Sequence, residues 1–212
     1  MAQDDFHLGA QVYSSDGTEI GDLVHVLTKA DGYEIDAVVV KETRRFAGHE
    51  LASELTTILD EFIVPRQAIK AASHDRVELS LNDSQIRRLP GYLRWREKGE
   101  SALEEAEDEA SILGSSPELP RWLEEVANKP ADELEIDGGE NVMLGHTGKK
   151  LGHVKDVLVD GTQLVGIVMQ PQGFFRTEVI VPRRFLVRSD DAALFVNLTK
   201  DDLERLQQFK AE

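Results

Sequence analysis

The chain has 212 residues, with 24 Lys and Arg against 40 Asp and Glu, which gives a formal net charge of −16 at pH 7. This balance argues against direct nucleic-acid binding, which needs clustered positive charge to neutralise phosphates. The absence of cysteine excludes disulfides and thiolate metal sites. We expect a cytoplasmic protein without a membrane span, because no apolar run approaches bilayer length and MAQDDFHLGA lacks the apolar core of a secretory signal.

The first 92 residues predict a series of short strands. QVY precedes a turn at SSDG; IGDLVHVL then predicts a strand, ADG a turn and DAVVV a buried strand. After an interval at about 42–62, FIVP predicts another strand, which Pro65 should end because proline cannot donate to a ladder. The alternating VELSL predicts a half-buried strand, and a short helix is expected to open at Asn82.

Residues 93–138 predict an acidic, partly helical linker. Positions 94–138 hold 5 Lys and Arg against 14 Asp and Glu, a local charge of −9, whereas residues 1–93 carry −7 and residues 139–212 are neutral. SALEEAEDEASIL predicts a helix with a thin apolar stripe, and PRWLEEVANK a second short helix that begins at its proline.

Both tryptophans of the chain, Trp95 and Trp122, fall in this linker. One interpretation is that each packs against a folded domain and so holds the linker in place. The other is that one of them anchors a partner protein, because exposed Trp is a favoured hot-spot residue.

The last part of the chain repeats the first. IVPR occurs at 63–66 and again at 180–183, and the ungapped match at this offset of 117 continues past Asn82, which lies under Thr199, to Tyr92, which lies under Phe209. Upstream, DGTEIGDLVHV lies over TGKKLGHVKDV at an offset of 131, so the first copy has an insertion of 14 residues within KETRRFAGHELASELTTILDE. The insertion predicts a short helix (HELASELTTIL) or long hairpin arms. The chain is therefore expected to use one structural unit twice.

This order of elements, with the glycine-containing starts GTEIGDLVHV and GKKLGHVKDV and the IVPR strands, resembles the PRC-barrel family. The resemblance covers residues 8–92 and 139–210, which we expect to be two domains. It implies a mainly β fold of two small antiparallel β-barrels, about six strands each, joined by the acidic linker. The family's domains act mainly as docking platforms for other macromolecules and share no catalytic residue set.

No catalytic, cofactor-binding or metal-binding residue is predicted. The six histidines lack HxxxH, HxH and HExxH spacings, and LGHTGKKLG lacks the first glycine and the Ser or Thr of a P-loop. The acidic run EEAEDE lacks the glycine bend of a calcium loop, so it predicts a solvated helix face. We therefore expect a non-enzymatic protein without cofactor or metal.

The stretch QPQGFFRTEV places Phe174, Phe175 and Arg176 at the hairpin tip where the first copy has its insertion. Two exposed aromatic rings at a tip favour a partner contact, and we name these three residues, with Trp95 and Trp122, as candidate contacts. The alternative is that one ring plugs the end of the barrel.

The sequence thus predicts a docking platform for a protein partner, and we expect a basic partner because the acidic chain would steer one. One alternative is a ribosome-assembly or RNA-processing accessory. Another is small-molecule binding in the cleft between the barrels.

Overall fold

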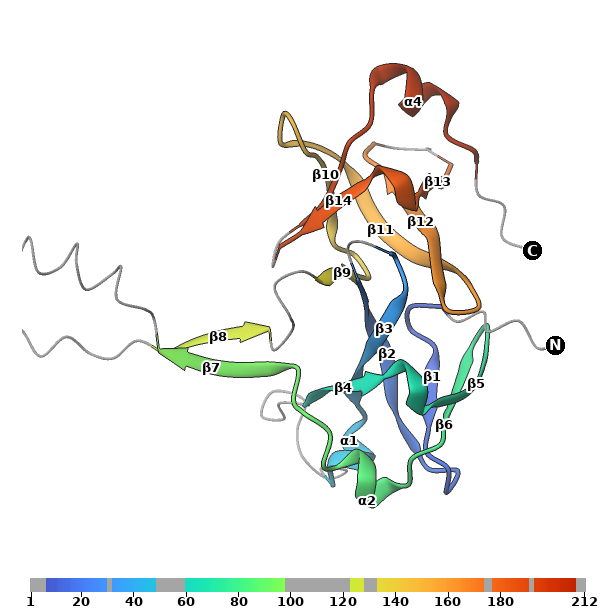
Figure 1. Cartoon of the computed structure of the whole chain (residues 1–212), viewed down its shortest axis with the longest axis vertical. Coiled ribbons are helices and arrows are strands. Elements are labelled where there is room, and N and C mark those ends of the chain that lie inside the picture. Colours follow the sequence, from blue (N-terminus) through green and yellow to red (C-terminus); the bar gives the residue numbers. More distant parts are fainter. Residues whose placement is uncertain are drawn as a thin grey trace, which may run out of the picture.

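The computed structural model describes residues 7–29, 32–48, 60–97, 123–127, 133–173, 177–190 and 193–208. Within these ranges the protein is mainly β, with two large sheets and one two-stranded sheet. Each large sheet is built mostly from one copy of the repeat, and the two lie end to end along the long axis of the molecule (Figure 1).

The first sheet follows the strand order β4-β3-β2-β1-β6-β5. Its strands are β1 (Gln11–Tyr13), β2 (Glu19–Lys29), β3 (Ile35–Glu42), β4 (Glu61–Pro65), β5 (Ile69–Ser73) and β6 (Arg76–Leu79). The short helix α1 (Arg44–Ala47) follows β3, the 3-10 turn η1 (Arg66–Ala68) joins β4 to β5, and α2 (Asp83–Ile86) follows β6.

The second sheet follows the same path, β13-β12-β11-β10-β15-β14, as the repeat predicted. Its strands are β10 (Asn141–Leu144), β11 (Lys149–Asp160), β12 (Gln163–Pro171), β13 (Val179–Pro182), β14 (Leu186–Ser189) and β15 (Ala193–Val196). The 3-10 turn η2 (Arg183–Phe185) joins β13 to β14, and α4 (Lys200–Arg205) follows β15.

Local signals in the sequence placed the element ends correctly. Both IVPR strands end at their proline, and α2 and α4 begin at the expected positions. Asn82 and Thr199 are the N-caps, and each forms a capping box with the third helical residue, Gln85 or Asp202. These side chains satisfy backbone N–H groups that the first helical turn leaves without partners.

The expectation of purely antiparallel sheets is wrong at one pair in each sheet. β1 pairs with β6, and β10 with β15, in parallel. β1 opens a copy and β6 closes it, so the rest of the copy supplies the long connection that a parallel pair requires. Among the described pairings no ladder joins β4 to β5 or β13 to β14, so neither sheet is closed by hydrogen bonds at these edges.

The region expected to be a partly helical linker contains three strands, β7 (Leu93–Glu97), β8 (Leu123–Ala127) and β9 (Glu133–Asp137). The helix predicted over PRWLEEVANK is wrong at residues 123–127, which form β8 and pair antiparallel with β7. A helix of ten residues is marginal by itself in water, whereas β8 gains a strand partner. The helix predicted over SALEEAEDEASIL lies outside the described residues, as do residues 49–59 of the insertion.

β9 joins the first sheet although it comes after the linker. It pairs antiparallel with β2, from His25 opposite Asp137 to Lys29 opposite Glu133, and it lies between the two large sheets in Figure 1. Ile136 of β9 is fully buried in one apolar cluster that contains core side chains of both sheets. The two copies therefore share a core.

The tips of the β2–β3 and β11–β12 hairpins also meet. The Ile35 N–H donates to the Thr162 carbonyl at 2.9 Å, and the Leu164 N–H donates to the Tyr33 carbonyl at 2.9 Å. These bonds join the two copies through backbone groups as well as through side chains.

The glycine in each IGD or LGH segment has a packing reason. A Cβ on Gly21 would lie 1.9 Å from the Lys41 carbonyl oxygen, and a Cβ on Gly152 would lie 2.1 Å from that of Gln170. The paired strands approach so closely here that no side chain fits.

We expect Gly21→Ala and Gly152→Ala each to lower the free energy of unfolding by about 2 kcal/mol or more, because the opposing strand must move. Gly32→Ala is the control: its Cβ would meet no atom within 4 Å, so its effect should stay within about 0.5 kcal/mol. Urea unfolding followed by circular dichroism measures all three. Wild-type stability in the first two variants would contradict this account of the repeat's glycines.

Candidate functional site

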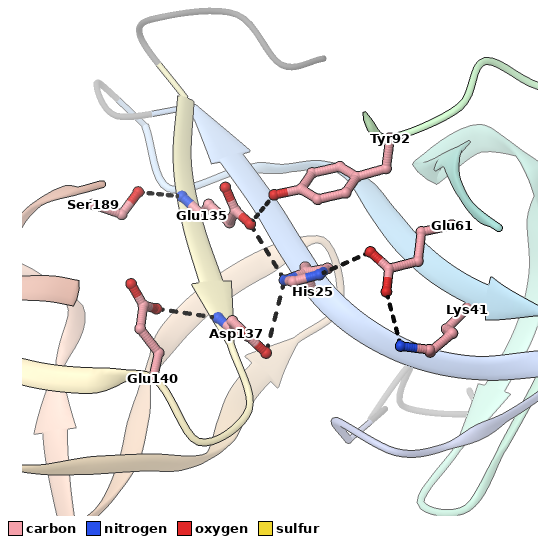
Figure 2. A network of polar contacts seen from close by, with 8 residues as sticks. All are labelled: His25, Lys41, Glu61, Tyr92, Glu135, Asp137, Glu140 and Ser189. Atoms are coloured by element: carbon pink, nitrogen blue, oxygen red, sulfur yellow. Dashed lines mark hydrogen bonds and ion pairs between the residues drawn. The ribbon is translucent and has the colours of Figure 1, made fainter. Parts of the chain in front are cut away.

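His25 lies where β2 and β9 pair, and it is surrounded by carboxylates. Its side chain is 12% exposed. The Nδ1 atom lies 3.2 Å from Glu135 Oε1 and 3.8 Å from Asp137 Oδ1, while Nε2 lies 3.7 Å from Glu61 Oε2 (Figure 2). Both ring nitrogens therefore face acidic groups, from β4 on one side and β9 on the other.

Neighbouring side chains hold these carboxylates in place. The Tyr92 hydroxyl donates a hydrogen bond to Glu135, and its ring stacks on the His25 imidazole with 4.8 Å between centroids. Lys41 Nζ lies 3.2 Å from Glu61 Oε1 (Figure 2). The phenol thus forms an aromatic wall beside the imidazole.

The backbone of β9 is fixed from the second copy. The Glu135 N–H donates to Ser189 Oγ at 2.8 Å, and the Asp137 N–H donates to Glu140 Oε2 at 3.3 Å (Figure 2). β9 is therefore held by β2 on one side and by residues of the second copy on the other.

Two carboxylates beside the same imidazole are shifted in opposite directions. The imidazole of His25 beside Glu61 holds the pKa of this carboxyl group below its ordinary value, with a further contribution from Lys41. Burial raises the pKa of Asp137, and the negative charge of Glu135 adds to this. Folding thus stabilises the ionised form of Glu61 and destabilises the ionised form of Asp137.

A pocket of about 220 Å3 opens beside this cluster, between the two sheets and the base of the β7–β8 hairpin. Leu93 and Ala127 line it on the hairpin side, and His25 and Tyr92 form part of its wall. The remaining lining residues are four carboxylates: Glu135, Asp137, Glu140 and Asp190. Because no Lys or Arg lines the pocket among the described residues, its chemistry suits a cationic group.

Both ring nitrogens of His25 face carboxylates. Within the described part of the chain, no three His, Asp or Glu side chains are arranged to hold a metal ion. The absence of metal and cofactor stays a prediction.

A second polar contact joins the copies at the corresponding place in the repeat. His25 corresponds to Asp156 at the offset of 131, and Asp156 accepts hydrogen bonds from the Leu8 N–H at 3.0 Å and from His7. The Gly9 N–H donates to the Leu23 carbonyl, and the Gly139 N–H donates to the Val154 carbonyl. When the two copies are aligned on these equivalent bonds, His7 corresponds to Asp137. A His–Asp pair therefore occurs at both places, His25 with Asp137 and His7 with Asp156. The two residue types are exchanged between the equivalent positions.

The structure does not describe the side chains of the predicted contact residues. Phe174, Phe175, Arg176 and Trp122 lie outside the described residues, and Trp95 belongs to β7, but its side chain is not described.

The sequence reasoning missed His25, Tyr92 and the carboxylates of β9. A signal for β9 was present: ELEID alternates acidic and apolar residues, the pattern of a half-buried strand, within a region interpreted as linker.

Comparison with known proteins supports the family assignment for the second copy. Residues 139–203 match the family model of the PRC-barrel domain. No protein of curated function matches the chain in sequence. No helix in the described ranges is both long and apolar enough to cross a membrane.

The opposite pKa shifts predict opposite effects of two isosteric substitutions. Because the pKa of Glu61 is lowered, its contribution to stability is present at neutral pH and is lost as pH falls through the folded-state value. Glu61→Gln should therefore lower the free energy of unfolding by about 1 kcal/mol at pH 7, with a smaller difference below about pH 4.

Asp137→Asn is the matched control, because the raised pKa of Asp137 means that its ionisation opposes folding at neutral pH. We expect no loss and a small gain at pH 7, limited by solvent screening because this side chain is 44% exposed. Urea unfolding at pH 7, 5 and 3 compares the variants. Equal losses at pH 7 in both variants would contradict the assignment.

Proposed function

We propose that the protein is a non-enzymatic docking platform for a basic protein segment, with one Lys or Arg side chain seated in the pocket between the sheets. The observation that supports this most directly is the composition of the pocket wall, which includes four carboxylates. A basic partner would also be steered by the net charge of −16.

The walls suit both parts of a long cationic side chain. Carboxylates form charge-assisted hydrogen bonds with guanidinium and ammonium groups, and the face of Tyr92 can attract a cation. Leu93 and Ala127 offer apolar surface to the methylene stem. A volume of about 220 Å3 is below the roughly 300–1,000 Å3 of pockets that enclose drug-sized ligands, so a side chain fits better than a larger free molecule.

We further propose that both copies are PRC-barrel-like domains and that each sheet curls into a small barrel. The edge strands β4 and β5 are joined by only three residues, as are β13 and β14, which favours curling. The bridges Phe62–Gly91 and Val179–Gln208 lie at the same offset of 117, which supports equivalence of the copies.

The other interpretations gain less support. An RNA accessory would have to place phosphates near a carboxylate-lined pocket, which is unfavourable. The predicted contacts Phe174, Phe175, Arg176, Trp95 and Trp122 stay predictions.

The test uses the full chain and a fluorescein-labelled peptide with one arginine flanked by three lysines on each side. Fluorescence anisotropy measures its dissociation constant at two salt concentrations. We expect binding that weakens at higher salt, because exposed charges are screened. The double variant Asp137→Asn/Glu140→Gln should bind about tenfold more weakly, a change of about 1.4 kcal/mol.

Asp75→Asn is the control, because it removes one carboxylate from an exposed turn whose side chain is 93% exposed and does not line the pocket. It should change binding less than twofold, as expected for a remote surface charge (roughly 0.4 kcal/mol or less). Equal affinity of the double variant and the wild type would refute the pocket. Preferential binding of a labelled single-stranded RNA would instead favour the RNA interpretation.

A further inference from the structure

The two copies meet around a local two-fold axis at the tips of their long hairpins. β2 and β11 correspond by the repeat, and their registers with β3 and β12 then align Val39 with Val168. Glu34 therefore corresponds to Gln163, and these two equivalent residues form a bridge with each other. The two backbone bonds beside this bridge exchange under the same operation. Contacts at such a junction are expected to occur in pairs.

The turn that leads into each copy has the same conformation. Its glycine, Gly9 or Gly139, has a φ of 86° or 89°. In each turn the residue after this glycine donates its N–H to the carbonyl two residues before the glycine, His7 at 3.1 Å in the first copy and Asp137 at 3.4 Å in the second. Both turns therefore direct the incoming chain in the same way relative to their own copy.

In the second copy the incoming segment is β9, which crosses to the first copy and ends with Asp137 opposite His25 of β2 (Figure 1). The segment that enters the first copy crosses as well. His7 contacts Asp156 of β11, and the Leu8 N–H donates to the same carboxylate at 3.0 Å. Because Asp156 corresponds to His25, this contact is the equivalent of the last pair of the β2–β9 ladder.

β11 continues past this contact with an edge that no described strand occupies. On one side it pairs with β12 as far as Asp160, whereas on the other side its pairing with β10 goes no farther than His153. The corresponding stretch of β2 pairs with β9. Val157 and Val159 of this stretch of β11 are buried, as in a strand whose one face lies in a core. Proteins usually cover such an edge.

The sequence before the first turn matches that of β9. Residues 5–7 read Asp-Phe-His, and the equivalent residues 135–137 read Glu-Ile-Asp. Each has one apolar residue between two polar ones, the pattern of a strand with one buried face. Ile136 is fully buried in the shared core, and Phe6 is its equivalent, although residues 1–6 lie outside the described ranges.

We propose that the edge of β11 is a strand-docking surface occupied by the protein's own chain. Residues 5–7 pair antiparallel with residues 156–158, and Phe6 enters the shared core at the position equivalent to Ile136. Each copy thus completes its sheet with the segment that leads into the other copy. The proposal does not depend on the acidic pocket.

The core limits the length of this strand. Leu134, the second apolar residue of β9, is 3% exposed, and its equivalent is Asp4. A carboxylate in an apolar core is unfavourable, so the pairing begins at Asp5 and is shorter than that of β9.

Cross-linking tests the register, because the chain contains no cysteine. In the β2–β9 ladder Glu135 lies opposite Leu27, and its N–H donates to Ser189 instead of to β2. Such a pair without mutual hydrogen bonds has closely spaced side chains, which suits a disulfide. Its equivalent is Asp5 opposite Leu158. We expect the full chain with Asp5→Cys/Leu158→Cys to lose both thiols on mild oxidation while it stays monomeric, as measured by thiol titration in denaturant and by size-exclusion chromatography.

Asp5→Cys/Asp160→Cys is the matched control, because Asp160 is an exposed residue two positions farther along β11. We expect its thiols to be lost at least about tenfold more slowly, since a displacement of roughly 7 Å along the strand exceeds the reach of a disulfide. Equal rates for the two pairs would indicate a segment without fixed register. Retention of both thiols by the first pair would indicate an edge open to another strand. Either result would overturn the proposal.

Urea unfolding of the full chain tests the burial of Phe6. Phe6→Ala should lower the midpoint by about 1 M or more, because a buried aromatic side chain is lost. Gln3→Ala, which precedes the paired residues, should leave the midpoint unchanged. A wild-type midpoint for Phe6→Ala would refute the placement of the ring in the shared core.

Discussion

The contact region between the two copies depends on the antiparallel pairing of β9 with β2. β9 comes from the chain segment that leads into the second copy, yet its strand partner, β2, belongs to the first sheet. Its register turns Leu134 and Ile136 into the shared core and puts Glu135 and Asp137 near His25. A shift by one residue would exchange the two sets and bury carboxylates in an apolar core, which is prohibitively unfavourable. Burial of the apolar residues of ELEID therefore determines where its alternating acidic residues lie.

The two copies of the repeat have the same sheet architecture but differ at their two ends. The two sheets share a strand order, the close-approach glycines and the capped helices. At the junction the residue types of a His–Asp pair are exchanged between the copies. At the outer end the first copy has Phe46 in its core, while described residues of the second copy line a pocket there. The two units thus differ at the junction and at the outer end.

Features set by short stretches of chain were predictable. The strands that end at Pro65 and Pro182, and the helices that begin after Asn82 and Thr199, follow from proline geometry and from capping. The parallel pairs, β8 and the pairing of β9 were not, because each depends on a partner far away in the sequence. The acidic pocket was missed for the same reason: His25, Tyr92 and Glu135 are distant in sequence, and only the fold brings them together. The cleft expected between the copies is where that pocket lies.

The crossing of β9 has a consequence for how the molecule can be divided. The family match begins at residue 139, two residues after β9 ends, so the unit recognised by sequence excludes a strand that precedes it directly. Cutting the chain at that boundary would leave β9 attached to the first copy, but without Ser189 and Glu140, which hold its backbone from the other side. His7 would likewise lose Asp156. We therefore expect deletions and domain exchanges within this architecture to preserve these contacts only when both copies move together.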